Sequence, residues 1–259
     1  MELDGAGVVV TGGGAGIGAA LARRFAAAGA RVVVNDLDAD AARAVAVETG
    51  GLAVPGDAAS AAGVGALIEA ARAHLGAIDL YCANAGVGGA PNLLDEAGWE
   101  LSWQVNVLAH VRAARELLPE WLERGRGHFL ATVSAAGLLT MLGAPSYSVT
   151  KHGALAFAEW LSATYGDRGI TVQALCPQGV RTAMLDASGA AGELLLAKSA
   201  ISPEQVAETV CESLDGGRFL ILPHPEAAAY YAGRATDTDQ WLAAMRRAQA
   251  QLDGAEQAR

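Results

Sequence analysis

Lysine, cysteine and long apolar runs are scarce in this chain of 259 residues. Lys and Arg total 18 against 28 Asp and Glu, and the resulting net charge of −10 argues against sequence-independent binding of nucleic acid or anionic lipid. No window approaches the ~18–20 uninterrupted apolar residues that a membrane span needs. The first residues carry neither a basic region nor an apolar stretch, so no secretion signal is expected and a cytoplasmic protein is predicted.

Cysteine and histidine do not form a recognisable ligand set. The three cysteines, Cys82, Cys176 and Cys211, are scattered, which predicts reduced thiols rather than disulfides. The histidines do not group with cysteines or carboxylates at metal-ligand spacing. We therefore expect no metal site.

What the sequence does contain is a regular alternation of short apolar runs and helical patterns. Apolar runs cover residues 7–10, 31–34, 52–55, 78–83, 128–134 and 170–176, and helical patterns cover 17–29, 39–49, 61–74, 99–121 and 146–168. Nearly all-apolar strands that alternate with helices are typical of a parallel sheet covered on both faces. No linker or change of composition interrupts the pattern, so residues 1–259 are predicted to form one α/β domain.

The alternation changes after Cys176. Residues 180–201 are interrupted by glycine and poorly periodic, which favours a mobile loop beside the substrate with at most a short helix. Residues 202–205 then predict a capped helix, 219–222 a last strand and 236–252 a closing C-terminal helix, with Trp241, Leu242, Met245 and Leu252 near one face. The residues from 254 onward are expected to fray.

A glycine-rich segment follows the first strand, Thr11-Gly-Gly-Gly-Ala-Gly-Ile-Gly18. Small residues there let a backbone approach a pyrophosphate, and the following helix N-terminus offers free N–H groups. Asp36 ends the second strand, eighteen residues beyond Gly18, where a carboxylate can accept bonds from ribose hydroxyls and repel a 2′-phosphate. NAD is therefore expected over NADP, although a turn or N-cap role for Asp36 stays open.

Tyr147 and Lys151 are four residues apart on a predicted helix and so share one face. A nearby ammonium favours the phenolate, which would lower the tyrosine pKa toward the neutral range. The alternative is a packed tyrosine beside a solvated surface lysine. Only two lysines, Lys151 and Lys198, occur in the chain, which makes a special role for Lys151 more plausible.

Several motifs together resemble the short-chain dehydrogenase/reductase family over nearly the whole chain. TGxxxGxG is present at residues 11–18, Ala-Asn-Ala-Gly at 83–86 resembles the family's NNAG, and Cys-Pro-Gln-Gly-Val-Arg-Thr at 176–182 resembles its PGxVxT segment. The catalytic tetrad of the family is matched by Asn106, Ser134, Tyr147 and Lys151. Ala83 and Gln178 depart from these motifs.

The resemblance implies a Rossmann-type, doubly wound parallel sheet of about seven strands and an NAD-dependent hydride transfer. Tyr147 would be the general acid/base, Lys151 would stabilise the phenolate and bond the nicotinamide ribose, Ser134 would orient the substrate oxygen, and Asn106 would hold a water. The expected cofactor-binding residues are Gly12, Gly14, Ala15, Gly16, Ile17, Gly18, Asp36, Leu37, Asp57, Ala58, Asn84, Ala85, Gly86, Tyr147, Lys151, Pro177, Gly179, Val180 and Thr182. For Asp57 a loop-capping role is the alternative.

The expected rim of the substrate pocket is mainly apolar: residues 136–139, Met141, Pro145, residues 88–91, Met184 and Leu185. This favours a small hydrophobic secondary alcohol or ketone. A sugar epimerase or dehydratase, and a non-catalytic NAD-sensing or scaffold protein of the same fold, are the alternatives. From the resemblance we expect a homodimer or homotetramer with interface helices at 99–121 and 146–168, and no nucleic acid or membrane partner.

Overall fold

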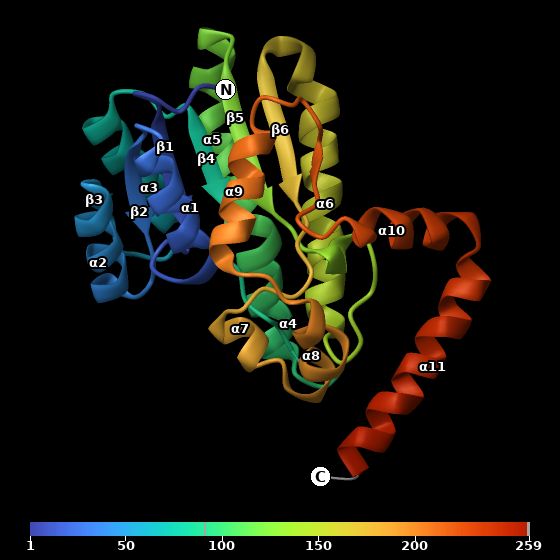
Figure 1. Ribbon diagram of the computed structural model, residues 1–259. Coiled ribbons are helices and arrows are strands. Elements are labelled where there is room, and N and C mark those ends of the chain that lie inside the picture. The colour runs from blue at the N-terminus through green and yellow to red at the C-terminus, as the bar shows by residue number, and fades with distance from the viewer. Residues whose placement is uncertain (91, 258–259) are drawn as a thin grey trace.

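Seven parallel strands form the centre of the protein in a computed structural model that describes residues 1–90 and 92–257 (Figure 1). The strand order is β3-β2-β1-β4-β5-β6-β7. The strands are β1 (Gly7–Thr11), β2 (Arg31–Asn35), β3 (Leu52–Ala53), β4 (Leu80–Ala83), β5 (Gly127–Thr132), β6 (Ile170–Leu175) and β7 (Leu220–Ile221). The predicted doubly wound α/β sheet is confirmed; β1 and β2 are one residue longer than their apolar runs, and the other strands are one or two residues shorter.

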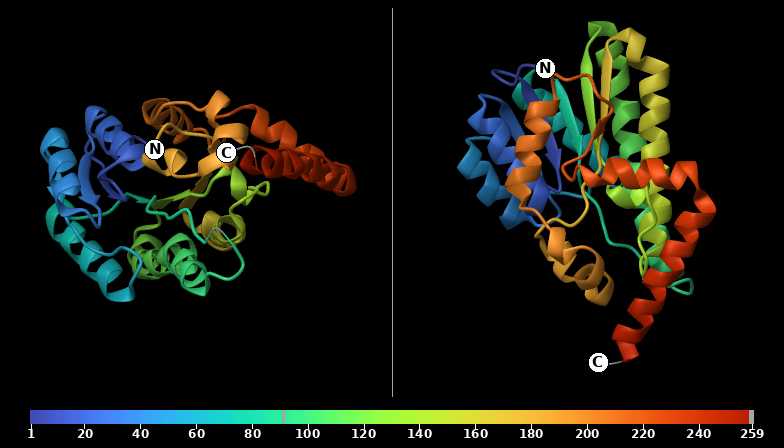
Figure 2. Two further views of the ribbon diagram at one scale, coloured as in Figure 1. Left: turned by 90° about the horizontal axis from the view of Figure 1, so that it is seen from below. Right: turned by 45° about the vertical axis from the view of Figure 1, so that its right-hand side comes forward.

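Helices cover both faces of the sheet, and each face has its own apolar core (Figure 2). One core contains side chains of α1 (Gly16–Ala27), α2 (Ala39–Thr49) and α9 (Pro203–Ser213). The other contains side chains of α3 (Ala61–Leu75), α5 (Ala109–Arg124) and α6 (Pro145–Tyr165). Because the strands are buried on both faces, their uninterrupted Val and Leu runs carry no alternation of polar and apolar residues.

The helix expected over residues 99–121 is interrupted. It consists of α4 (Glu96–Trp103), a π-helical turn (Gln104–Leu108) and α5. Asn106 lies within the π-helical turn, where the register widens by one residue. Periodicity does not reveal such a turn, because one extra residue shifts the apolar stripe by less than a third of a turn.

The segment 180–201 is ordered into short helices rather than an irregular loop. It contains α7 (Ala183–Asp186), α8 (Gly189–Leu195) and a 3₁₀ turn (Ala197–Ser199). Its two ends are held together by an isolated parallel bridge between Val180 and Ile201. The bridge closes this segment into a compact lid, a name kept below for residues 180–201.

The C-terminal part differs from the single helix expected over 236–252. It forms two helices, α10 (Glu226–Thr236) and α11 (Thr238–Gln257), which project from the body and are called the C-terminal arm (Figures 1 and 2). Periodicity does not reveal a helix over residues 226–236, because alanine and glycine make up most of the segment and give little apolar contrast between faces. Leu252 is 3% exposed but Leu242 is 46% exposed, so the predicted common face was wrong for Leu242. The helix continues to Gln257 instead of fraying at 254, and residues 258–259 lie outside the described range.

Candidate functional site

The predicted site residues lie on the loops after strands β1 to β6, in the π-helical turn and on α6. These parallel strands are neighbours, so the loops after them meet at one edge of the sheet. The strand order reverses between β1 and β4, and in open α/β sheets ligands bind in the crevice at such a switch point.

The glycine loop is packed too tightly to accept side chains. Gly12 has φ +60°, and a Cβ at Gly18 would lie 2.0 Å from the Gly12 carbonyl oxygen. A Cβ at Gly14 would lie 2.9 Å from Oδ2 of Asp36. The absent side chains leave bare backbone at the N-terminus of α1, which fits a dinucleotide pyrophosphate.

Asp36 faces this loop. Its Oδ2 accepts a 2.9 Å hydrogen bond from the Gly14 N–H, and its Oδ1 accepts one of 3.0 Å from the Asp38 N–H. The N-cap of α2 is Asp38 rather than Asp36, since the Asp38 carboxylate accepts from Asp40 and Ala41. Asp36 therefore makes a turn contact with Asp38 as well as its contact with the glycine loop. Each carboxylate oxygen keeps a second lone pair for another donor.

Residues 57 and 58 are placed differently from each other. Asp57 is exposed, and its Oδ1 accepts a 2.8 Å hydrogen bond from the Ala59 N–H, which is the contact expected of a loop-capping residue. Ala58 is buried in the core beneath α3. Leu37, next to Asp36, is 76% exposed at the surface.

Asn84 joins three strands below the site. Its Nδ2 donates to the Thr11 carbonyl (2.9 Å), and its Oδ1 accepts from the Thr132 hydroxyl (3.1 Å). The Thr11 hydroxyl in turn accepts from the N–H groups of Asn84 and Ala85. This network keeps the backbone at 84–86 beside the glycine loop even though Ala83 offers no side-chain bond.

Lys151 is buried, with 3% of its surface exposed. Its Nζ donates a 2.8 Å hydrogen bond to the Thr132 carbonyl and lies 5.5 Å from the ring centroid of Tyr147. Burial lowers the Lys151 pKa to about 8. The alternative of a solvated surface lysine is therefore wrong.

The pKa of Tyr147 is raised, not lowered as expected from the sequence. Burial is the larger cause, and a hydrogen bond with Ser134 opposes it. The ammonium of Lys151 is directed to the Thr132 carbonyl and over the tyrosine ring, so its charge does not offset desolvation of the phenol.

Ser134 has a strained backbone, with φ +147° and ψ +157°. This region is nearly exclusive to glycine, and residues held there cluster at functional sites. Its Oγ accepts a 3.1 Å hydrogen bond from the Ala136 N–H and donates a long one of 3.5 Å to the Pro177 carbonyl. The strain fixes the serine hydroxyl next to Tyr147.

Asn106 is fully buried in the π-helical turn. Its side-chain amide exchanges two 3.0 Å hydrogen bonds with the backbone of Val87 and donates to the Thr150 hydroxyl. A Cβ at Gly86 would lie 3.2 Å from Oδ1 of Asn106 and 3.4 Å from Nζ of Lys151. The two side chains therefore meet at Gly86.

The segment after β6 returns to the glycine loop. A Cβ at Gly16 would lie 3.1 Å from Cγ2 of Thr182. The glycine loop is therefore in contact with the predicted cofactor-binding segment that follows β6. Gln178 is held through its backbone N–H, which donates to Nδ1 of the buried His224 (3.1 Å). Pro177, Gly179 and Val180 are buried beneath the lid.

The expected rim residues of the substrate pocket differ in how deeply the structure buries them. A Cβ at Gly143 would lie 3.3 Å from Cβ of Ala191 in α8, so the lid contacts the loop that follows Ser134. Leu138 is fully buried, and Met184 is 44% exposed. Pro91 lies outside the described residues.

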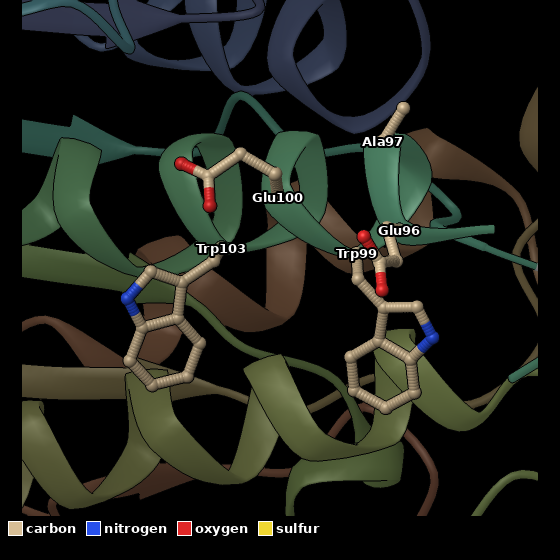
Figure 3. Close-up of a pocket in the computed structure, with 5 residues that line it drawn as sticks. All are labelled: Glu96, Ala97, Trp99, Glu100 and Trp103. Carbon is tan, nitrogen blue, oxygen red and sulfur yellow. The ribbon is translucent and has the colours of Figure 1, made fainter. Parts of the chain in front are cut away.

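A separate surface hollow lies on α4 and is lined by Glu96, Ala97, Trp99, Glu100 and Trp103 (Figure 3). The two indoles point from α4 toward α6, and Trp103 is close enough to Gly153 that a Cβ there would lie 3.6 Å from its ring. None of the predicted catalytic residues lines the hollow.

Sequence reasoning missed three groups that hold the site. They are the Thr11 hydroxyl, the Thr132 carbonyl and the backbone of Val87. Thr11 has a sequence signal, because it opens the glycine motif. The other two act through the backbone, so residue type gives no sign of them.

Within residues 1–90 and 92–257, no group of three or more His, Cys, Asp or Glu side chains is arranged to hold a metal ion. In the same described ranges, no helix is both long and apolar enough to cross a membrane.

Comparison with known proteins agrees with the geometry. A family model for short chain dehydrogenases matches residues 6–192. The chain is 36% identical to 1-deoxy-11-beta-hydroxypentalenate dehydrogenase of Streptomyces exfoliatus, over 88% of this chain and 86% of that protein. It is 33% identical to 7alpha-hydroxysteroid dehydrogenase of Escherichia coli strain K12, over 79% and 78%.

A solved structure shares the fold over almost the full length. It is a short chain dehydrogenase/reductase from Burkholderia phymatum in complex with NAD, with a TM-score of 0.85 and 29% identity over 93% of this chain and 96% of that one. The match over residues 6–192 and the strand order of the sheet both support the family assignment, in addition to the short sequence motifs. The chain belongs to the short-chain dehydrogenase/reductase family of oxidoreductases.

Proposed function

We propose that the protein is an NAD-dependent oxidoreductase that interconverts a small hydrophobic secondary alcohol and its ketone. The observation that carries this proposal is the buried Lys151, whose Nζ lies between the Thr132 carbonyl and the ring of Tyr147. Burying an ammonium costs free energy, and so a protein retains one at such a position for a reason other than stability.

The residues of the chain divide the work as follows. The Tyr147 hydroxyl donates its proton to a ketone oxygen or, in the other direction, takes the proton of an alcohol. Ser134, which is hydrogen-bonded to Tyr147, orients the same substrate oxygen. NAD, when bound, supplies the acceptor or donor of the hydride.

Lys151 has two roles in this proposal. Its positive charge stabilises the phenolate that forms when Tyr147 gives up its proton. It would also donate a hydrogen bond to the nicotinamide ribose. Proton exchange with solvent passes through a water held between Lys151 and Asn106, beside Gly86.

The cofactor is bound by the glycine loop and by the backbone at 84–86 and 177–182. The contact of Asp36 with Gly14 at the loop supports NAD over NADP, because a 2′-phosphate would be repelled there. The relative from Burkholderia phymatum was solved with NAD. Residues Leu37, Asp57 and Ala58 surround the adenine side of the same crevice in this proposal.

The substrate class follows from the apolar loop after Ser134, the lid and the named relatives. One relative is a dehydrogenase of a hydroxypentalenate and another of a 7alpha-hydroxysteroid.

A cytoplasmic location and a homodimeric or homotetrameric assembly are also part of the proposal. The assembly is supported by apolar side chains that are exposed on two helices: Leu101 and Trp103 on α4, and Val149 and Trp160 on α6. A monomer in light scattering would contradict the assembly.

The deciding experiment is an assay of NAD and NADP reduction at the nicotinamide absorbance across a panel of secondary alcohols. Turnover with alicyclic or steroid-like alcohols and NAD, lost in Tyr147→Phe, supports the proposal. Turnover restricted to polyhydroxylated or phosphorylated substrates would contradict the substrate class. Binding of NAD without turnover would favour the non-catalytic alternative.

A further inference from the structure

Arg234 is the residue that connects the C-terminal arm to the loop carrying Ser134. It lies near the end of α10, where the neighbouring side chains are exposed, but its own side chain is partly buried. Its Nη1 donates to the carbonyl of Leu138 and to Nε2 of His152, the latter over 2.9 Å. One guanidinium group thus joins three separate elements.

The contact sets the hydrogen-bonding role of each ring nitrogen of His152. A guanidinium only donates hydrogen bonds, so Nε2 of His152 must accept. The proton then resides on Nδ1, which lies 2.8 Å from the Ser148 carbonyl and donates to it. Both ring nitrogens of His152 are therefore hydrogen-bonded, Nδ1 as a donor and Nε2 as an acceptor.

The two acceptors lie next to the catalytic residues in the chain. Leu138 ends the 3₁₀ turn (Ala135–Gly137) that follows Ser134, and its own N–H donates to the Ala135 carbonyl. His152 follows Lys151 on α6. A Cβ at Gly137 would lie 2.7 Å from the Lys151 carbonyl oxygen, so the turn packs directly on the backbone of α6.

We infer that Arg234 is a positioning residue for the reaction, because it holds the turn after Ser134 against α6 and so sets the distance between Ser134 and Tyr147. The inference rests on the proposed function for its kinetic consequences. The backbone of Ser134 is strained, and a strained residue persists only where its surroundings over-determine it. Arg234 supplies part of that constraint from outside the site.

The arm also reaches the lid. α11 contacts α8, and Leu252 near its end is buried. In the ribbon views the arm leaves the body at α10 and extends past the level of α7 and α8 (Figures 1 and 2). The C-terminal arm therefore contacts the turn after Ser134 through Arg234 and contacts the lid through α11.

The test is the variant Arg234→Met, with Arg247→Met as the matched control on the exposed surface of α11. Arg234→Met should lower kcat/KM for the alcohol at least tenfold and leave the Kd for NAD within twofold. The control should change neither. If Arg234→Met kept kcat/KM within twofold of the wild type, the inference would be overturned.

A double-mutant cycle with His152 separates positioning from general destabilisation. His152→Leu removes the acceptor, and His152→Gln retains one acceptor and one donor. In the Arg234→Met background, we expect His152→Leu to lower kcat/KM little further. In the wild-type background, we expect His152→Gln to keep most of the kcat/KM that His152→Leu loses. Fully additive losses, or equal losses in both His152 variants, would show that the contact has no role.

Hydrogen exchange provides a readout that does not depend on catalysis. In Arg234→Met the amides of residues 135–139 should exchange at least tenfold faster, while those of the glycine loop stay unchanged. Wild-type protein without NAD-linked turnover would contradict the proposed function, and faster exchange in Arg234→Met would then still show that Arg234 holds the turn after Ser134 against α6. Unchanged exchange at 135–139 would overturn it.

Discussion

The Nζ of Lys151 donates a 2.8 Å hydrogen bond to the carbonyl of Thr132 at the end of β5. This bond ties the reactive face of α6 to the strand that leads into Ser134. It also orders a cation inside the protein beside Gly86, where a Cβ would lie 3.4 Å from Nζ. The geometry leads to five predictions.

Lys151→Met should separate stability from activity. Burial lowers the Lys151 pKa from 10.5 to about 8, so between pH 8 and 10.5 the unfolded chain binds a proton that the folded protein does not. The contribution of Lys151 to the free energy of unfolding therefore rises with pH between pH 8 and 10.5. Below pH 8 the buried charge destabilises the folded protein by its full amount. At pH 7 the variant should be as stable as the wild type or more stable, by up to about 3 kcal/mol.

The measurements are denaturant unfolding at pH 7 and 10, kcat and the Kd for NAD. We expect the stability difference to shrink at pH 10, kcat to fall at least 100-fold and NAD binding to weaken. An unchanged affinity for NAD would show that Lys151 does not bond the cofactor ribose.

Tyr147→Phe removes only the hydroxyl. General acid–base catalysis typically contributes 10²–10⁴-fold, so kcat should fall by about that factor. Because the ring and its contact with Lys151 remain, NAD should bind with nearly unchanged affinity, which fluorescence titration of NADH can measure. Retention of more than a tenth of the wild-type kcat would exclude Tyr147 as the acid/base.

Ser134 allows a test of backbone strain. Its φ of +147° is unfavourable for any residue with a Cβ and costs about 1–3 kcal/mol. Ser134→Gly should therefore gain stability relative to Ser134→Ala, while both variants lose most of their activity with the hydroxyl. Thermal unfolding and kcat are measured side by side; a Ser134→Gly variant less stable than Ser134→Ala would contradict the strain.

Gly86→Ala places a methyl group beside the two atoms that are proposed to share a water. The Cβ would lie 3.2 Å from Oδ1 of Asn106 and 3.4 Å from Nζ of Lys151. We expect kcat to fall about tenfold or more. Gly65→Ala in α3 is the matched control, because no atom lies within 4 Å of a Cβ there, and it should keep full activity.

Cofactor choice is tested by Asp36→Ser combined with Leu37→Arg. The double variant removes the carboxylate that repels a 2′-phosphate and adds a guanidinium at an exposed position. The ratio of kcat/KM for NADP to that for NAD should rise at least 100-fold, or about 2.7 kcal/mol. A ratio that stays unchanged would show that Asp36 does not discriminate between the cofactors.

The sequence determined the parallel α/β architecture, because strands buried on both faces need uninterrupted apolar residues and the helices between them need one apolar stripe each. It also predicted the glycine loop, where the backbone approach that only glycine permits is visible in residue type. The predicted helix cap at Ser202 is present, with the capping box to Gln205. All of these are local properties of the chain.

The tertiary structure decided what depends on distant groups. It set the direction of the Tyr147 pKa, since desolvation and the orientation of Lys151 toward Thr132 are not encoded in their spacing. It also inserted the π-helical turn at Asn106, ordered the lid, and placed Arg234 between Leu138 and His152. Residue type states what a side chain can bond, and only the packing of the whole chain brings its partner within reach.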